Sequence, residues 1–427
     1  MLCISSLLID NNTLILDSYI LYLIQFIFNF LFLLSKTKYL NDFLMPSYIF
    51  IIYIGISQIL GGFLAPRGFG WEKGFYNSLS VVSNMNVIVF FNLLVNFILT
   101  ILTLNFITKK EYNINFEIRV SNKKPFFLIL LIFIFFIITI LQKYWLFPLQ
   151  LALVIVILYE LSGFNRFVKL LSISFLLIMM LMMNFESKRE IIMAFIAVIF
   201  YIFYRNKTKF NISSIFLIPV IFFGFIIFVL TASIMRGYGD LDDRTFINSF
   251  IYLPVYLSSE NFLDSVVDNF ELNYSYSVPI IAMEYVLQGK IEFQYGMSLL
   301  KILFLVFPRS IFDMKPESMM LMFTRVYDYD FYSRGGSLPI ILSSELFMNF
   351  YIFAIPVFFL IMWYMNKVYI KIFFTGSLMT FFICIHVIIT FFMFMRGSGF
   401  DLFIFNILMA VAFYVFVAKI LYKVRFK

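Results

Sequence analysis

Residues 126–142 read FFLILLIFIFFIITILQ, a run without a charged residue that is bounded by Lys124 and Lys143. A membrane-spanning helix needs about 20 predominantly apolar residues. Runs of this kind recur along the chain, so that 63% of its 427 residues are hydrophobic and 13% are charged. A soluble domain is about 45–50% apolar and about 25% charged. The composition excludes a soluble globular enzyme, a disordered protein and a disulfide scaffold, and it predicts a polytopic membrane protein.

The apolar runs predict an all-α fold with about 11 transmembrane helices. They cover residues 14–34, 43–65, 79–104, 126–142, 145–160, 167–184, 190–204, 212–232, 338–365, 372–393 and 401–421. The run 338–365 is long enough to hold a half-helix followed by a full span. Cys3 and Cys384 belong to no CxxC pair or Cys/His cluster, so the sequence predicts neither a disulfide framework nor a metal site.

The positive charges predict the orientation of the chain, because basic residues collect in the cytoplasmic loops of membrane proteins. With a cytoplasmic C-terminus, every second connection between spans is also cytoplasmic. The cytoplasmic segments then hold Lys36, Lys38, Lys109, Lys110, Arg119, Lys123, Lys124, Arg166, Lys169, Arg205, Lys207, Lys209, Lys367, Lys371, Lys419, Lys423, Arg425 and Lys427. The short outer loops hold Arg67, Lys73, Lys143, Lys188, Arg189 and Arg396. This bias predicts an outer N-terminus, an inner C-terminus and an odd number of spans.

Three parts are expected from this pattern. A bundle of about eight spans covers residues 1–232, a large outer loop covers 233–337, and a bundle of about three spans covers 338–427. The loop holds eight basic and 13 acidic residues, whereas the whole chain carries a net charge of +8. The charge balance therefore reports orientation and not a nucleic-acid partner. Within the loop, residues 274–306 alternate polar and apolar stretches, which predicts amphipathic helices lying at the membrane surface.

Charged residues at the outer membrane boundary are the candidate functional residues. They lie in four stretches, which are FESKRE with Arg189, SIMRGYGD with Arg236, FPRSIFDMKPES with Arg309, Asp313 and Lys315, and MRGSGFD with Arg396. Arginine presents a planar fork of donors that suits phosphate oxygens. Several arginines at one membrane surface therefore predict binding of a lipid-linked phosphate or diphosphate.

Each of these stretches also has an ordinary structural explanation. Arg189 and Arg236 fit interfacial side chains that extend toward the headgroups. The segment around Arg309 fits a turn whose backbone is fixed by flanking prolines. An ordinary loop arginine is the alternative for Arg396, but it fits less well. Arg396 lies in a short outer loop that the positive-inside trend prefers to be neutral, and the glycines beside it free the backbone to approach a ligand.

Two ionisable residues lie inside apolar runs. Glu345 lies in LPIILSSELFMNFYIF, where an ionised group is costly unless it is paired or faces a cavity. We expect a general base or a partner of an arginine there, the alternative being a carboxylate at the membrane interface. His386, the sole histidine, lies in FFICIHVIITFFM and is expected to be a hydrogen-bonded structural residue. The acidic stretch DLDD (240–243) lacks the spacing of a calcium loop and fits a solvated turn.

The layout resembles the O-antigen polymerase (Wzy) family of oligosaccharide repeat-unit polymerases. Members of this family have about eleven spans, one large periplasmic loop before the last three, and a short cytoplasmic tail. PRSIFDMKP (308–316) resembles the "PR…KP" element of the family's large loop. Arg189 and Arg396 resemble arginines that the family places at the outer face.

A second stretch carries the same resemblance. SSELFMNF (343–350) is similar to the family's "aE-x-y-x-NFG" motif at the start of the following span, matching at Glu345, Asn349 and Phe350. The chain departs from the motif at Tyr351, where family members commonly carry glycine. That departure bears on how tightly this helix packs.

The resemblance implies a GT-C-like, all-helical fold in a bacterial inner membrane, with a periplasmic N-terminus. It implies transfer of a growing glycan from undecaprenyl diphosphate to the non-reducing-end hydroxyl of a newly arrived lipid-linked repeat unit. No cofactor and no metal are implied. The implied partners are undecaprenyl-diphosphate-linked oligosaccharides, membrane lipids and a chain-length regulator protein.

Departure of a diphosphate develops negative charge that fixed arginines stabilise, and the acceptor hydroxyl needs a base within hydrogen-bond reach. Glu345 is the preferred base and Asp313 the reserve. The candidate diphosphate-binding residues are Arg189, Arg236, Arg309, Lys315, Arg325 and Arg396.

Three other functions compete with this one. The related O-antigen ligases rely on a periplasmic histidine, whereas His386 lies within a predicted span. A repeat-unit flippase or another transporter predicts charged residues spread through a central cavity and short loops on both sides. A membrane acyltransferase predicts a catalytic histidine near a loop.

Overall fold

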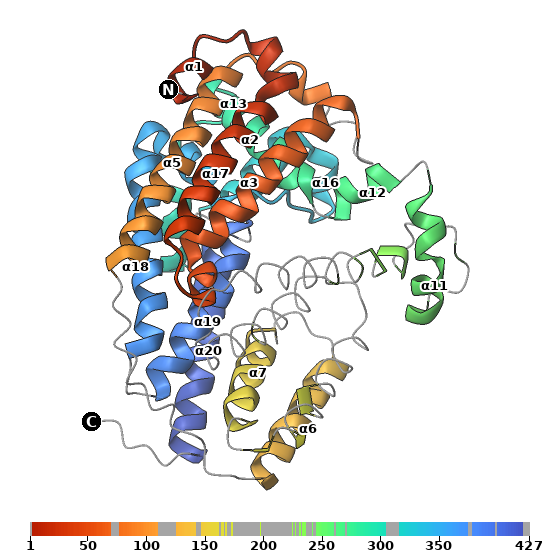
Figure 1. The fold of residues 1–427 in the computed structure, drawn as a ribbon, viewed down its shortest axis with the longest axis vertical. Helices are drawn as coiled ribbons and strands as arrows, with labels where there is room; N and C mark the ends of the chain where they lie inside the picture. Colours follow the sequence, from red (N-terminus) through yellow and green to blue (C-terminus); the bar gives the residue numbers. More distant parts are fainter. Residues whose placement is uncertain are drawn as a thin grey trace. The chain divides into compact units, whose positions relative to one another are not determined.

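The structure is a computed structural model that describes residues 2–69, 77–109, 125–141, 147–161, 245–259, 262–269, 271–304, 316–374, 378–397 and 399–421, with scattered positions between 164 and 241 (Figure 1). These residues form helices joined by turns and contain no strand. They divide into two compact units. The first comprises Met1–Lys110, Lys209–Tyr364 and Phe394–Asp401, and the second comprises Glu111–Thr208, Met365–Met393 and Leu402–Lys427.

Four helical segments within the described ranges are long and apolar enough to cross a membrane. They are Asn11–Lys36, Pro46–Arg67, Met85–Thr108 and Leu342–Ile372. Shorter apolar helices cover Leu128–Ile138, Pro148–Leu161, Ile247–Leu257, Met379–Met395 and Leu402–Val417. The protein is therefore membrane-embedded, and its described part is all-helical.

Most of the predicted apolar runs coincide with helices. The runs 167–184, 190–204 and 212–232 fall largely outside the described residues. The run 338–365 is divided as expected, into the short helix α17 (Leu342–Phe350), the 3-10 turn η7 (Tyr351–Phe353) and the long helix α18 (Ala354–Phe374). The prediction of a half-helix followed by a span is thus confirmed.

The first unit begins with α1 (Leu2–Ser6), α2 (Asn11–Lys36), η1 (Leu40–Leu44), α3 (Pro46–Leu64), η2 (Ala65–Arg67) and α5 (Met85–Lys109). The helices α2, α3 and α5 pack against one another, as Figure 1 shows in red and orange. Asp10 caps α2 by accepting a hydrogen bond from the Asn12 N–H at 3.1 Å. Pro46 occupies the first turn of α3, where a missing N–H costs no hydrogen bond.

Amide side chains join these three helices inside the apolar layer. Asn96 of α5 donates to Gln58 of α3 at 2.8 Å and to Gln25 of α2 at 3.3 Å. Gln25 in turn donates to the carbonyl of Leu93 at 2.7 Å. Hydrogen bonds between membrane helices are worth about 0.6–2 kcal/mol each. This buried layer therefore fixes the register of α2, α3 and α5.

The expected outer loop contains α11 (Phe246–Leu257), α12 (Phe262–Asn269), the π-helical turn η5 (Asn273–Ser277), α13 (Val278–Leu287), α14 (Met297–Leu300), η6 (Lys301–Phe304), α15 (Met319–Tyr327) and α16 (Tyr329–Ser333). One of these helices, α15, is amphipathic. It buries Met319 and Phe323 while Arg325 and Val326 are exposed.

Helix α13 corrects the expectation of membrane-surface helices within residues 274–306. All but two of its 10 residues are buried, and the buried ones are Val278 through Glu284 and Val286. It packs against α5 and α17, which cover its apolar side chains. The alternation of polar and apolar residues was misleading here because the polar members are themselves buried and hydrogen-bonded. Ser277 is fully buried, and Ser275 donates to the Glu271 carbonyl at 2.9 Å.

The second unit contains α6 (Pro125–Leu141), α7 (Phe147–Leu161) and most of α19 (Leu378–Met395) and α20 (Phe400–Leu421). Aromatic rings join three of these helices. Phe382 of α19 lies 5.3 Å from Tyr159 of α7 and 5.4 Å from Tyr414 of α20. The turn between α19 and α20 belongs to the first unit.

Candidate functional site

The structure describes three of the predicted site residues, namely Arg325, Glu345 and Arg396, and all three belong to the first unit. Arg189, Arg236, Arg309, Asp313 and Lys315 lie outside the described residues.

Arg396 forms an ion pair with Glu271, a residue of the predicted outer loop. Both side chains are mostly enclosed, with 21% of the arginine and 23% of the glutamate exposed. Two unit charges interact more strongly at a partly buried site than in bulk water. The pair therefore ties the turn after α19 to the segment that leads into η5.

The backbone on both sides of this pair is unusual. Glu271 has φ of 54°, a left-handed conformation that costs a non-glycine residue energy. Gly397, next to Arg396, has φ of 106°. A Cβ atom at Gly397 would lie 2.5 Å from the carbonyl oxygen of Ile340, so glycine is required there. Backbone strain of this kind clusters at functional sites.

Ile340 connects the Arg396 turn to α17. It lies two residues before this helix, and Glu345 lies in the first helical turn. The backbone N–H groups of Ser344 and Glu345 both donate to the Ile341 carbonyl at 3.0 Å. Glu345 itself is 3% exposed. The carboxylate is thus enclosed by protein and lies in the first helical turn.

Helix α17 is held from two sides. Phe347 packs against Phe91 of α5 with 4.8 Å between ring centroids. The Asn349 side chain donates to the Glu345 carbonyl at 2.8 Å and accepts from the Ser298 hydroxyl at 2.9 Å. These contacts fix the helix that carries Glu345.

Tyr351 ends α17 with φ of 53° and ψ of −126°, a conformation that glycine adopts with little cost. The resemblance places a glycine at this position. The tyrosine ring packs against Phe347 at 5.2 Å and against Phe293 at 5.6 Å. Aromatic packing therefore offsets the unfavourable backbone conformation.

Glycines of α3 allow the Glu271 segment to approach closely. A Cβ atom at Gly61 would lie 2.6 Å from the Cβ of Tyr276 and 3.3 Å from the Leu272 carbonyl oxygen. The Tyr53 hydroxyl of the same helix hydrogen-bonds Ser275 and lies within electrostatic range of Arg396. Helix α3 therefore lies beside the Arg396–Glu271 ion pair.

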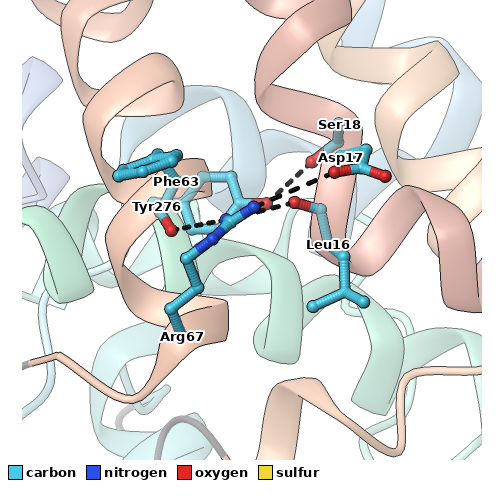
Figure 2. A network of polar contacts seen from close by, with 6 residues as sticks. All are labelled: Leu16, Asp17, Ser18, Phe63, Arg67 and Tyr276. Atoms are coloured by element: carbon cyan, nitrogen blue, oxygen red, sulfur yellow. Dashed lines mark hydrogen bonds and ion pairs between the residues drawn. The ribbon is translucent and has the colours of Figure 1, made fainter.

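Figure 2 shows the polar contacts at the adjacent end of α3. Tyr276 of η5 and Ser18 of α2 share a hydrogen bond of 3.0 Å, and burial raises the pKa of the tyrosine hydroxyl to about 12. Arg67 donates to the carbonyl of Phe63 at 2.7 Å and lies 3.9 Å from Asp17. These contacts join α2, α3 and η5 at the end of the helices.

Arg325 has different surroundings. Its guanidinium lies 3.1 Å from the Glu317 carboxylate, which also accepts from the Tyr332 hydroxyl at 2.9 Å. The arginine side chain is 47% exposed, whereas the Glu317 side chain is 14% exposed. Arg325 thus belongs to an ion pair that is open to water on the arginine side.

His386 is buried in α19, and its Nδ1 lies 3.3 Å from the Tyr414 hydroxyl. The expectation of a hydrogen-bonded structural histidine is confirmed.

Sequence reasoning missed two acidic residues. Glu271 looked like any other acid of an acidic loop. Glu284, in α13, is 2% exposed and accepts from the backbone N–H groups of Ser83 at 2.9 Å and Asn84 at 3.2 Å. It also accepts from the Gln288 side chain at 2.6 Å. Its position in the apolar stretch IAMEYVL was the available signal, since a buried carboxylate needs donors.

Within the described ranges, no three His, Cys, Asp or Glu side chains come together in a way that could hold a metal ion. The guanidinium of Arg396, the carboxylate of Glu271 and the hydroxyl of Tyr53 lie near one another, and Glu345 follows five residues after Ile340, which approaches Gly397. Groups of these kinds suit binding of an anion and transfer of a proton.

The chain has no significant match among family models, curated proteins or solved structures.

Proposed function

We propose that this protein is a membrane glycosyltransferase that polymerises lipid-linked oligosaccharide repeat units. It transfers the growing glycan from undecaprenyl diphosphate to the non-reducing end of a new undecaprenyl-diphosphate-linked unit. The observation that supports the proposal most is the enclosed Arg396–Glu271 pair. Its backbone neighbour Gly397 contacts Ile340, which precedes the helix that carries the buried Glu345.

Arg396 is the proposed diphosphate ligand. In the resting protein Glu271 pairs with its guanidinium, and a diphosphate offers pairs of oxygens that the same planar fork can bind, with more charge. Substrate binding then exchanges one anionic partner for another, so the arginine stays paired throughout. The predicted ligands Arg189, Arg236, Arg309 and Lys315 would share the charge of the leaving group, whereas Arg325 is paired with Glu317 and is left out of this role.

The reaction is a substitution at the anomeric carbon of the donor glycan. The acceptor hydroxyl oxygen bonds to that carbon while the bond from the carbon to the diphosphate oxygen breaks. Undecaprenyl diphosphate leaves with the electron pair, and fixed arginines stabilise its charge. Glu345, or Asp313 in its place, takes the proton of the hydroxyl.

The proposal sets the protein in the bacterial inner membrane with a periplasmic N-terminus and a cytoplasmic C-terminus. The excess of basic residues in alternate connections supports this orientation. It puts the Arg396 turn on the periplasmic side, where lipid-linked units would reach it from the bilayer. A chain-length regulator protein would be its partner.

The test uses a strain lacking the gene and complemented with variants at equal protein level. Deletion should leave surface polysaccharide with a single repeat unit, and Arg396→Ala or Glu345→Gln should do the same. A normal ladder of chain lengths in both variants would overturn the site assignment. Loss of even the single-unit product on deletion would instead favour a flippase.

A further inference from the structure

Helix α11 (Phe246–Leu257) has one face that the protein covers. Ser249, Leu253 and Tyr256 are buried, at a spacing of four and three residues. Leu253 and Tyr256 form a hydrophobic cluster with Leu230 and Ile234. Residues three and four apart lie on one side of a helix, so this side faces the end of the apolar run 212–232.

The other face of α11 is apolar and uncovered. The side chains of Ile247, Phe250, Ile251, Val255 and Leu257 are 69%, 52%, 68%, 59% and 43% exposed. They recur at the same helical spacing. The face contains no charged residue and none of the Trp, Tyr or Arg side chains that anchor protein–protein interfaces.

The length of α11 prevents it from crossing a bilayer. Its 12 residues extend over roughly 18 Å at 1.5 Å per residue, whereas the hydrocarbon core is about 30 Å thick. Its buried face contacts Leu230 and Ile234. A helix of this length with an uncovered apolar face can lie along a membrane but cannot cross it.

The ends of α11 fit a location at the membrane interface. The Thr245 side chain caps the N-terminus by accepting from the Asn248 N–H at 3.3 Å. At the other end, the hydroxyl groups of Ser258 and Ser259 donate to the carbonyls of Pro254 at 3.1 Å and Tyr256 at 2.7 Å. Backbone N–H and C=O groups near lipid must find hydrogen-bond partners within the protein. These capping side chains supply some of those partners.

We propose that α11 lies in the plane of the membrane interface, with its Ile247–Leu257 face in the boundary between headgroups and acyl chains. The bilayer is the partner whose chemistry matches an uncharged, aliphatic and phenyl face on a membrane-embedded protein. Residues 274–306 were expected to play this role, and α13 is enclosed instead. The proposal does not depend on the glycosyltransferase function.

Spin labels test the proposal in the full-length protein. The variant Cys3→Ser/Cys384→Ala supplies a background without cysteine, and a single cysteine is introduced at Ile251. The labelled protein is reconstituted in vesicles of phosphatidylethanolamine and phosphatidylglycerol. Collision rates with oxygen, which concentrates in lipid, and with a water-soluble nickel chelate are then compared.

Two matched positions calibrate the measurement. Phe28 of α2 is 72% exposed on a long apolar helix and reports lipid, whereas the exposed Ser333 of α16 reports water. The ratio of oxygen to nickel collisions at Ile251 should be several times that at Ser333 and approach that at Phe28. Labels at Ile247 and Val255, which are 69% and 59% exposed, repeat the test on the same face.

Two results would overturn the proposal. A ratio like that of Ser333 would mean that α11 faces water. Low collision rates with both reagents would mean that another protein or a second copy of the chain covers the face.

Discussion

Two arginine–carboxylate pairs in the first unit have the same chemistry in different surroundings. Arg325 and Glu317 meet at 3.1 Å, and the arginine is 47% exposed whereas the glutamate is 14% exposed. Arg396 and Glu271 are both mostly enclosed, and Glu271 itself and Gly397, next to Arg396, have positive φ. An exposed pair is worth about 0–1 kcal/mol, so nothing in the fold needs to be distorted to make one. The strained backbone at Glu271 and Gly397 indicates that the exact position of Arg396 matters, and not only its pairing.

Removal of each arginine should give the largest contrast. Arg396→Ala should reduce polymer formation by about 10²–10³-fold, as loss of one transition-state donor does, whereas Arg325→Ala should change it much less. Arg396→Lys should restore part of the activity, since it keeps the charge and loses the fork. The readout is the chain-length distribution of the polysaccharide on gels. Equal losses in the two alanine variants would erase the contrast.

The backbone beside the enclosed pair gives the next effect. A strained backbone conformation alone costs about 1–3 kcal/mol. Gly397→Ala should destabilise the protein by more than that, because the new Cβ also meets the Ile340 carbonyl. Gly289→Ala is the control, as Gly289 has φ of 71° and nothing within 4 Å of the added carbon. Thermal unfolding in detergent measures both. A smaller shift for Gly397→Ala than for Gly289→Ala would argue against the close contact.

Replacing the carboxylates of Glu271 and Glu317 by amides should give a smaller difference in stability between the two pairs. Glu271→Gln should cost about 1–3 kcal/mol, the range for an interaction lost at a mostly buried group. Glu317→Gln should cost less, because its partner Arg325 is 47% exposed and water can replace part of the lost interaction. Glu271→Gln should also raise the affinity of the purified protein for inorganic diphosphate, measured by calorimetry, because Arg396 is no longer occupied. Unchanged affinity would mean that Glu271 does not compete with the anion.

Salt should reveal the smallest difference. The coupling energy of Arg325 and Glu317, from a double-mutant cycle, should be about 0.2–1 kcal/mol. It should fall as ionic strength rises, because the Debye length shortens from about 10 Å at 0.1 M to 3 Å at 1 M. The coupling of Arg396 and Glu271 should change less. A similar decline in both cycles would show that water and ions reach the enclosed pair equally well.

The helices were predictable because their signal is local. Most of each predicted run that the structure describes lies in a helix, and the length of 338–365 indicated that it could hold two helical segments, though not that the break falls at Tyr351. A run of apolar residues must be helical in lipid wherever its neighbours lie. Arg396 and Glu345 were found for a related reason, since a charge in an apolar stretch stands out.

The contacts that build the site were not predictable, because they join residues far apart in the chain. Nothing near Glu271 in the sequence distinguishes it from the other acids of its loop, and its partner Arg396 lies 125 positions further on. The burial of α13 depends likewise on α5 and α17. A periodic pattern predicts that one face of a helix will be shielded from water. It does not show whether protein or lipid shields that face.

The hydrogen bonds that Glu284 accepts just before α5 have a consequence for the synthesis of the protein. The carboxylate accepts the Ser83 N–H across 201 positions of the chain. At the ribosomal rate of about 5–20 residues per second, Ser83 is made roughly 10–40 s before Glu284. During that interval the N–H groups of Ser83 and Asn84 must donate to water or to the insertion machinery. The segment that leads into α5 therefore gains these native partners only when a much later part of the chain is made.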